Sequence, residues 1–147
     1  MANVKQRAER FTLLSTVQSA EVARASERYR MSLSGLEQAN EKLRSLEDYF
    51  SAGPDHKAEY ISSMGLQEAS VFSQRLQKAI AAQREICDQL ASQSEAARSL
   101  LMQAELRRVG FDKAKVAAHR QLQAEQNHRE QRRTEDNLMA RYRGHRP

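Results

Sequence analysis

The sequence has few of the residues that build a globular core or interrupt a helix. Its 147 residues include no Trp, one Cys, two Pro and five Gly, and only 39% are hydrophobic. So small an apolar share excludes a sizeable core, while scarce Gly and Pro leave long stretches free to be helical. There is no run of about 18 apolar residues that could cross a membrane, and the first residues lack the apolar core of a signal peptide. We therefore expect a cytoplasmic protein.

Residues that could carry chemistry are equally scarce. Cys87 has no second cysteine for an internal disulfide and no clustered ligands for zinc, so we interpret it as a small helix residue. The four histidines are dispersed, without the spacing of a helical metal site; they are His56, His119, His128 and His145. A phosphate-binding GxxxxGK loop, a GxGxxG motif and an HExxH motif are all missing. The sequence therefore predicts a protein that is not an enzyme and holds no metal or cofactor.

What the first half does contain is a seven-residue repeat of apolar positions. Charged residues make up 29% of the chain, a composition typical of long helices and coiled coils. Position a of the repeat falls on Ala8, Ser15, Val22, Tyr29, Leu36, Leu43 and Phe50, and position d on Val4, Phe11, Gln18, Ala25, Ser32, Ala39 and Leu46. Positions a and d share one face of a coiled-coil helix. We predict the all-α class and a first helix over residues 3–50.

A second repeat follows a connection that ends the first helix. Gly53 favours a left-handed cap and Pro54 cannot continue the hydrogen-bond ladder, so the turn region is expected over residues 51–65. Within it, "DHKAEYISSM" predicts a short helical piece capped by Asp55. The second repeat has Ala69, Leu76, Gln83, Leu90, Ala97, Ala104, Phe111 and Ala118 at a, and Phe72, Ala79, Ile86, Gln93, Leu100 and Ala114 at d. It predicts a second helix over residues 66–143.

Two long helices joined by a compact connection fold back as an antiparallel hairpin. We therefore predict a single coiled-coil domain over residues 1–147, in which residues near Val4 lie opposite Lys113 to Val116. The second helix would then extend beyond the first as an overhanging C-terminal helix. Past Ala118 its repeat loses nearly all apolar character.

Positive charge is concentrated in the same C-terminal part. Residues 107–147 contain 11 Lys and Arg against 5 Asp and Glu, a net charge of +6, whereas residues 1–106 contain 13 against 14, a net charge of −1. A basic end of this kind fits an acidic or carbonyl-lined protein pore, an acidic partner surface or nucleic acid.

An apolar stretch near the connection invites a second interpretation besides packing between the helices. In "VFSQRLQKAIAAQ", Phe72, Leu76, Ala79 and Gln83 follow steps of four, three and four residues, as the hairpin contact requires. Ile80 lies at the flank of this face, and apolar residues also gather just before the stretch and at the end of the first helix. The aromatic end of the hairpin is therefore wider than a two-helix contact needs, which indicates a docking surface for another protein.

At these residues the sequence resembles the FliJ family of the bacterial flagellar type III export apparatus. The similarity lies in "LRSLEDYF" before the turn, "VFSQRLQKAIAAQ" after it and "EQNHREQRRTEDNLMARY" near the end. The resemblance implies an antiparallel coiled coil like the central stalk of rotary ATP synthases, acting in flagellum assembly and thus in motility and chemotaxis. It implies three partners, namely the hexameric export ATPase FliI, the export gate protein FlhA and export chaperones. It also implies a location at the flagellar base, peripheral to the inner membrane.

The resemblance also assigns site residues. The export-gate face would comprise Tyr49, Phe72, Leu76, Ala79 and Gln83. The part that enters the ATPase ring would comprise Phe11, Arg129, Arg132, Arg133 and Arg141. Arginine suits this second role because its planar guanidinium group forms several charge-assisted hydrogen bonds with carboxylates or carbonyls in a pore.

Four other interpretations of the sequence stay open. A stalk protein of the related injectisome has similar length and charge. A nucleic-acid-binding hairpin would explain the basic end, although acidic residues are interleaved with the arginines and no aromatic stacking platform accompanies them. The chain could also be a generic coiled-coil scaffold or a homodimer, whereas the stalk interpretation predicts a free monomer. Light scattering separates these last cases.

Overall fold

The protein is all-helical in the residues that the computed structural model describes, which are 2–52 and 63–145. Helix α1 covers Ala2–Ala52 and helix α2 covers Ser63–Gly144, and this described part contains no strand. Long stretches without Gly or Pro explain two such long helices, and α1 ends just before the Gly53-Pro54 pair of the sequence. The expected helical piece capped by Asp55 lies largely outside the described residues, and its last two residues already belong to α2.

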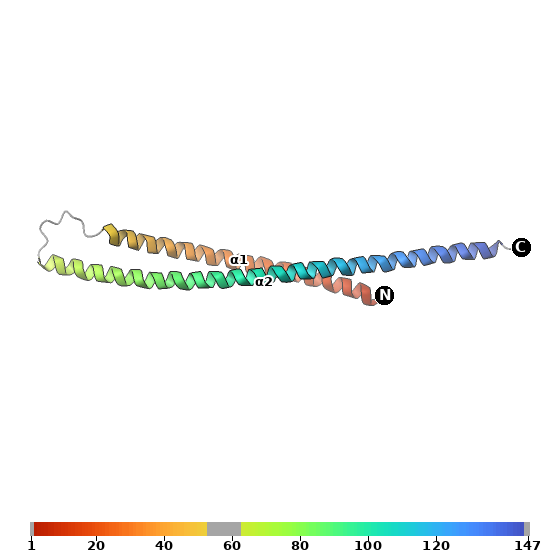
Figure 1. Cartoon of the computed structure of the whole chain (residues 1–147), viewed down its shortest axis with the longest axis horizontal. Coiled ribbons are helices and arrows are strands. Elements are labelled where there is room, and N and C mark those ends of the chain that lie inside the picture. The colour runs from red at the N-terminus through yellow and green to blue at the C-terminus, as the bar shows by residue number, and fades with distance from the viewer. Residues whose placement is uncertain (1, 53–62, 146–147) are drawn as a thin grey trace. The chain divides into compact units, whose positions relative to one another are not determined.

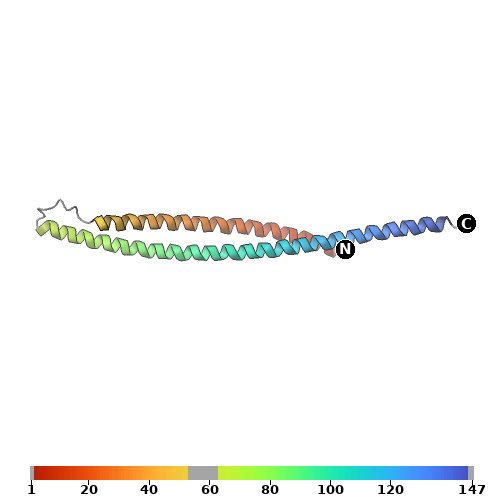
Figure 2. The same cartoon turned by 45° about the horizontal axis from the view of Figure 1, so that its top comes forward.

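The chain divides into two units, each of which combines a part of α1 with a part of α2. The terminal unit consists of Met1–Arg24 and Met102–Pro147, and the central unit consists of Ala25–Leu101. In each unit the two helical parts lie side by side (Figures 1 and 2). The prediction of two helices packed against each other is therefore confirmed.

The helix directions are antiparallel within each unit. In the central unit, Tyr49 near the end of α1 contacts Phe72 near the start of α2, while Gln83 reaches back to Ala39. In the terminal unit, Thr12 contacts His119 and Ser15 contacts Asp112. Residues later in α1 therefore contact residues earlier in α2.

The repeat predicted for α1 is confirmed by burial. Of its a and d positions, every residue from Val4 to Leu46 is buried or half-buried, and only Phe50 is exposed. Many of these side chains are small, including the buried Ala8, Ser15 and Ala39. Apolar and small residues on one stripe, with polar residues elsewhere, define the contact face of this helix.

Of the repeat predicted for α2, the a positions are confirmed and most of the d positions are wrong. All its a positions are buried or half-buried, but the d residues Phe72, Ala79, Ile86, Gln93 and Leu100 are exposed, and only Ala114 is half-buried. The helix instead packs through the residues that come one position later, which are Ser73, Ile80, Cys87, Ser94, Leu101, Arg108, Lys115 and Leu122. Spacings of three and of four residues both follow a helical stripe, so the partner helix decides which side is covered. Ile80, expected at the flank, lies in the contact.

The contact between the helices is made mainly by small and polar side chains. The buried apolar residues are Ala8, Ala39, Ile80, Cys87, Ala104 and Ala118, and the buried polar residues are Ser15, Gln18, Gln83 and Ser94. Among the described residues none with a large side chain is fully buried. Most layers of the contact therefore remove little apolar surface from water and add little stability, and Ile80 is the largest buried apolar side chain among them.

Pairing within the terminal unit reaches further along α2 than expected. The Thr12 to His119 and Ser15 to Asp112 contacts place the level of Val4 beyond His119 rather than at Lys113 to Val116. Burial on α2 continues through Leu122 and ends at Glu125. The expected position of Val4 was wrong because it assumed that the helices pair evenly from the connection outward.

Candidate functional site

Two aromatic side chains form an exposed contact in the central unit. Tyr49 comes from the last turn of α1 and Phe72 from the beginning of α2, and both rings are exposed. Their centroids lie 6.1 Å apart with an interplanar angle of 66°, an edge-to-face arrangement. Such pairs add roughly 0.5–1.5 kcal/mol beyond area burial. The pair therefore fixes two apolar rings on the surface, where a partner can reach them.

The other three residues of the predicted gate face differ in accessibility. Leu76 is half-buried, whereas Ala79 is exposed. Gln83 is buried, and its side-chain Nε2 donates a hydrogen bond of 3.0 Å to the backbone carbonyl of Ala39. The structure thus brings Tyr49, Phe72 and Ala79 to the surface, while the Gln83 amide links α2 to α1 through Ala39, about three helical turns along α2 from Phe72.

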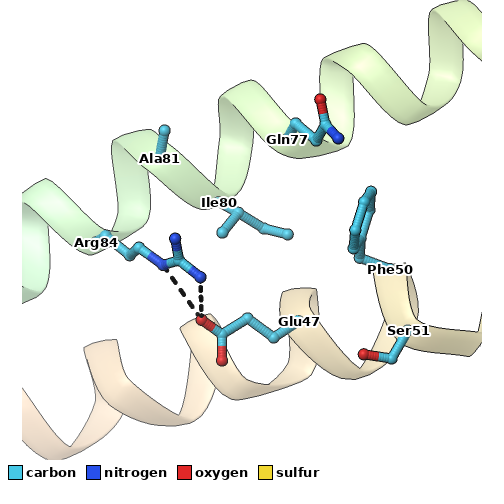
Figure 3. Close-up of a pocket in the computed structure, with 7 residues that line it drawn as sticks. All are labelled: Glu47, Phe50, Ser51, Gln77, Ile80, Ala81 and Arg84. Atoms are coloured by element: carbon cyan, nitrogen blue, oxygen red, sulfur yellow. Dashed lines mark hydrogen bonds and ion pairs between the residues drawn. The ribbon is translucent and has the colours of Figure 1, made fainter.

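A shallow hollow lies between the helices of the central unit (Figure 3). Arg84 on α2 points to Glu47 on α1, and both its Nε and its Nη2 donate to Glu47 Oε1, at 3.3 Å and 3.1 Å. Ile80 and the ring of Phe50 face the same hollow. Sequence analysis missed this ion pair because its partners are 37 residues apart, and no repeat spacing relates them. Both groups are partly exposed, so the pair contributes little to stability.

Polar contacts hold the helices together in the terminal unit. The Ser15 hydroxyl donates to Asp112 Oδ1, and Thr12 Oγ1 lies 2.9 Å from His119 Nε2. Asp112 also lies 3.5 Å from Arg108 through its other carboxylate oxygen. The predicted ring residue Phe11 is half-buried here, with the guanidinium carbon of Arg7 5.7 Å from its ring centroid. Such a cation–π contact covers one face of the ring and limits its access to a partner.

The four arginines predicted for the ATPase ring lie on an exposed part of α2. Every residue from 126 to 144 is exposed, including Arg129, Arg132, Arg133 and Arg141. Within the described residues, no ion pair occupies the guanidinium group of any of the four. They are therefore available to bind carboxylates or carbonyls of another molecule. Phe11, in contrast, is placed in the packed part of the same unit.

Neither a membrane-spanning helix nor a metal-binding cluster occurs among the residues that the structure describes. Neither α1 nor α2 combines the length and apolarity that a membrane-spanning helix needs. Among the same residues, no group of three or more His, Cys, Asp or Glu side chains is arranged to hold a metal ion.

In the described residues, two long paired helices carry exposed aromatic and basic side chains, which is the architecture of the coiled-coil class. Residues 7–146 match the family described as "Flagellar FliJ protein". The chain therefore belongs to the FliJ family and is a flagellar export-related protein, and the family is a non-catalytic component of that export system. Comparison with curated proteins found no match. Comparison with solved structures also found none.

Proposed function

We propose that this chain is the central stalk of the flagellar export ATPase ring and couples that ATPase to the export gate. The observation that carries the proposal is the exposed, arginine-rich end of α2. Residues 126–144 contain five arginines against three carboxylates, and all of them are exposed. In the proposed role this segment overhangs the paired helices and enters the hexamer of FliI.

The physical basis of coupling is an asymmetric set of charged contacts. A single helix inside a six-fold ring cannot contact all six subunits equally, so it stabilises some subunit conformations over others. The guanidinium groups of Arg129, Arg132, Arg133 and Arg141 supply contacts with fixed planar geometry. Differential binding of this kind shifts the equilibrium between subunit states and favours ring assembly. Phe11 would stabilise the packed part of the terminal unit, from which the arginine-rich segment continues.

The exposed aromatic pair supports the gate-binding part of the proposal. Tyr49 and Phe72 present two exposed rings, and Ala79 is exposed further along α2, while the half-buried Leu76 and the buried Gln83 belong to the contact between the helices. Aromatic side chains held in place lose little conformational entropy on binding. The proposed partner here is FlhA, which would hold the chain at the flagellar base, peripheral to the inner membrane. In this proposal the protein also escorts export chaperones.

The first experiment measures ATP hydrolysis by the cognate export ATPase while this protein is titrated at fixed enzyme concentration. We expect stimulation that saturates near one copy per hexamer. The double variant Arg132→Ala/Arg133→Ala should lose most of the stimulation. Arg30→Ala/Arg44→Ala, which removes two exposed cations of the central unit, is the matched control and should behave as the unaltered chain. Full stimulation by Arg132→Ala/Arg133→Ala would remove the main support for the stalk.

The second experiment measures binding to FlhA by calorimetric titration. Phe72→Ser should weaken binding by roughly tenfold or more, because it removes a ring at the centre of the proposed contact. Val71→Ser changes the adjacent exposed apolar residue and should have little effect. Equal losses for both variants would show that binding does not depend on the aromatic pair.

A further inference from the structure

The outer side of α2 in the terminal unit carries an apolar stripe that the helix pairing does not use. The stripe consists of Met102, Leu106, Val109, Lys113, Val116 and Arg120, which follow alternating steps of four and three residues. Residues that contact α1, such as Ala104, Phe111 and Ala118, lie on the opposite side of the helix. This second repeat therefore has coiled-coil spacing and faces solvent.

Exposure of the apolar members is substantial. Met102 is 58% exposed, Leu106 72%, Val109 41% and Val116 50%. The outermost positions of a two-helix pair are normally polar, and they are polar on either side of the stripe. Glu95 and Ser99 precede it, and Gln123 and Asn127 follow it. The apolar surface is thus confined to about five helical turns, a length of roughly 27 Å.

The surroundings of the stripe favour close approach of another helix. A shallow hollow lies along it between Val109 and Arg120, with Ala117 at its side. A Cβ atom added at Gly110 would meet no atom within 4 Å, so packing inside this chain does not explain the glycine. Gly in a helix interior costs about 1 kcal/mol relative to Ala. Gly110 and Ala117 lie beside the apolar residues, and their small size leaves room for another helix to approach closely.

Charge indicates which kind of helix fits. Lys113 and Arg120 are exposed and lie within the stripe. In the part of the chain that the structure describes, no carboxylate forms an ion pair with either of them. A partner helix therefore gains from carboxylates placed opposite these two cations. A second copy offers them poorly, because parallel pairing sets Lys113 against Lys113. Asp112, the carboxylate that lines the same hollow, is already engaged by Ser15 and Arg108 of its own chain.

We propose that this stripe binds an amphipathic helix of another protein whose apolar residues are flanked by carboxylates. The partner helix lies along α2 from Met102 to Arg120 and completes a three-helix contact in the terminal unit. The stripe shares no residue with the aromatic pair or with the arginines at the end of α2. Binding here is therefore compatible with both surfaces of the proposed stalk and does not depend on that function.

The test uses the full chain and two fluorescein-labelled helical peptides of 21 residues at physiological salt. Both peptides carry Leu at alternating spacings of four and three, flanked by Glu in one and by Lys in the other. Fluorescence anisotropy should show saturable binding of the Glu peptide and much weaker binding of the Lys peptide. Leu106→Gln/Val109→Gln should weaken binding of the Glu peptide by roughly tenfold or more. Leu13→Gln/Val17→Gln, which alters two exposed apolar residues of α1 in the same unit, should not.

A charge-reversal variant tests the carboxylate requirement separately. Lys113→Glu/Arg120→Glu should no longer bind the Glu peptide and should bind the Lys peptide instead. Partial unfolding would weaken binding of both peptides and cannot produce this exchange. Equal binding of both peptides, or binding of neither, overturns the proposal. A doubled mass in light scattering that Leu106→Gln/Val109→Gln abolishes would assign the stripe to a second copy instead. Co-sedimentation with phosphatidylglycerol vesicles that the same variant abolishes would assign it to a membrane surface.

Discussion

The side chain of Gln18 is buried in the contact between the helices, but its carbonyl oxygen accepts no hydrogen bond. Gln18 occupies a d position of α1 and is 9% exposed, and its Oε1 has no partner in the described structure. Gln83 is buried to a similar degree, and its amide donates to the carbonyl of Ala39. The same residue type thus carries an unpaired buried oxygen in one unit and a satisfied amide in the other. Unpaired buried polar atoms cost about 1–3 kcal/mol.

Gln18→Leu should therefore stabilise the protein. It removes the unpaired oxygen and adds apolar contact at a d position, so we expect the free energy of unfolding to rise by about 1 kcal/mol. Gln83→Leu is the matched variant and should give a clearly smaller gain, because it also removes a hydrogen bond. Urea unfolding followed by circular dichroism measures both. A larger gain for Gln83→Leu would contradict the difference between the two amides.

For α2, the sequence analysis placed part of the contact face on the wrong side of the helix. Ile80 is 7% exposed and Ile86 is 45% exposed, although the predicted repeat had Ile86 inside and Ile80 at the flank. These two identical side chains on one helix therefore provide an internal test of the observed pairing.

Ile80→Ala should destabilise the protein by roughly 2–3 kcal/mol, because it leaves a cavity in the helix contact. Ile86→Ala should change the free energy of unfolding by less than about 0.5 kcal/mol, as substitutions at exposed positions usually do. Thermal unfolding monitored at 222 nm compares the two variants with the unaltered chain. The reverse order of effects would restore the repeat that the sequence predicted.

The different outcomes for the two helices have a physical cause. Along α1, Val22, Leu36 and Leu43 fall on one stripe that no neighbouring stripe rivals, so the contact face could be predicted. Along α2, the stripe of Phe72, Ile86 and Leu100 is as apolar as that of Ile80, Cys87 and Leu101. Only the partner helix selects between them, and hydrophobic spacing carries no information about that choice.

In the candidate site, features that depend on nearby residues could be predicted from the sequence, and features that depend on the partner helix could not. Exposure of Arg129 to Arg143 could be predicted because the apolar repeat disappears from the local sequence. The gathering of Tyr49 and Phe72 at the same end could also be predicted. Their edge-to-face geometry, the Gln83 to Ala39 hydrogen bond and the Glu47 to Arg84 pair could not, since each depends on the stagger between two helices.

At the scale of the whole molecule, composition and charge argue against self-association. The chain carries a net charge of +5, and residues 107–147 alone carry +6. Two copies that meet through their terminal units bring these charges together, which opposes pairing at moderate salt. The helix contact itself is formed by both helices of one chain.

We expect a monomer at all accessible concentrations. Multi-angle light scattering should give a mass of 16.8 kDa that does not change with protein concentration. Raising the salt concentration weakens charge repulsion and should still leave the monomer, because pairing within one chain already covers the main apolar stripe. A mass that doubles with concentration would support the homodimer interpretation of the sequence.

The burial of Cys87 gives the chain a built-in reporter of helix separation. Cys87 is the single cysteine, carries a free thiol and lies within the contact between the helices. A thiol reagent reaches its sulfur only when α2 moves away from α1, so the rate of modification measures how often the pair opens. No label or substitution is needed. Protection of this thiol on adding a partner protein would reveal that binding clamps the two helices together.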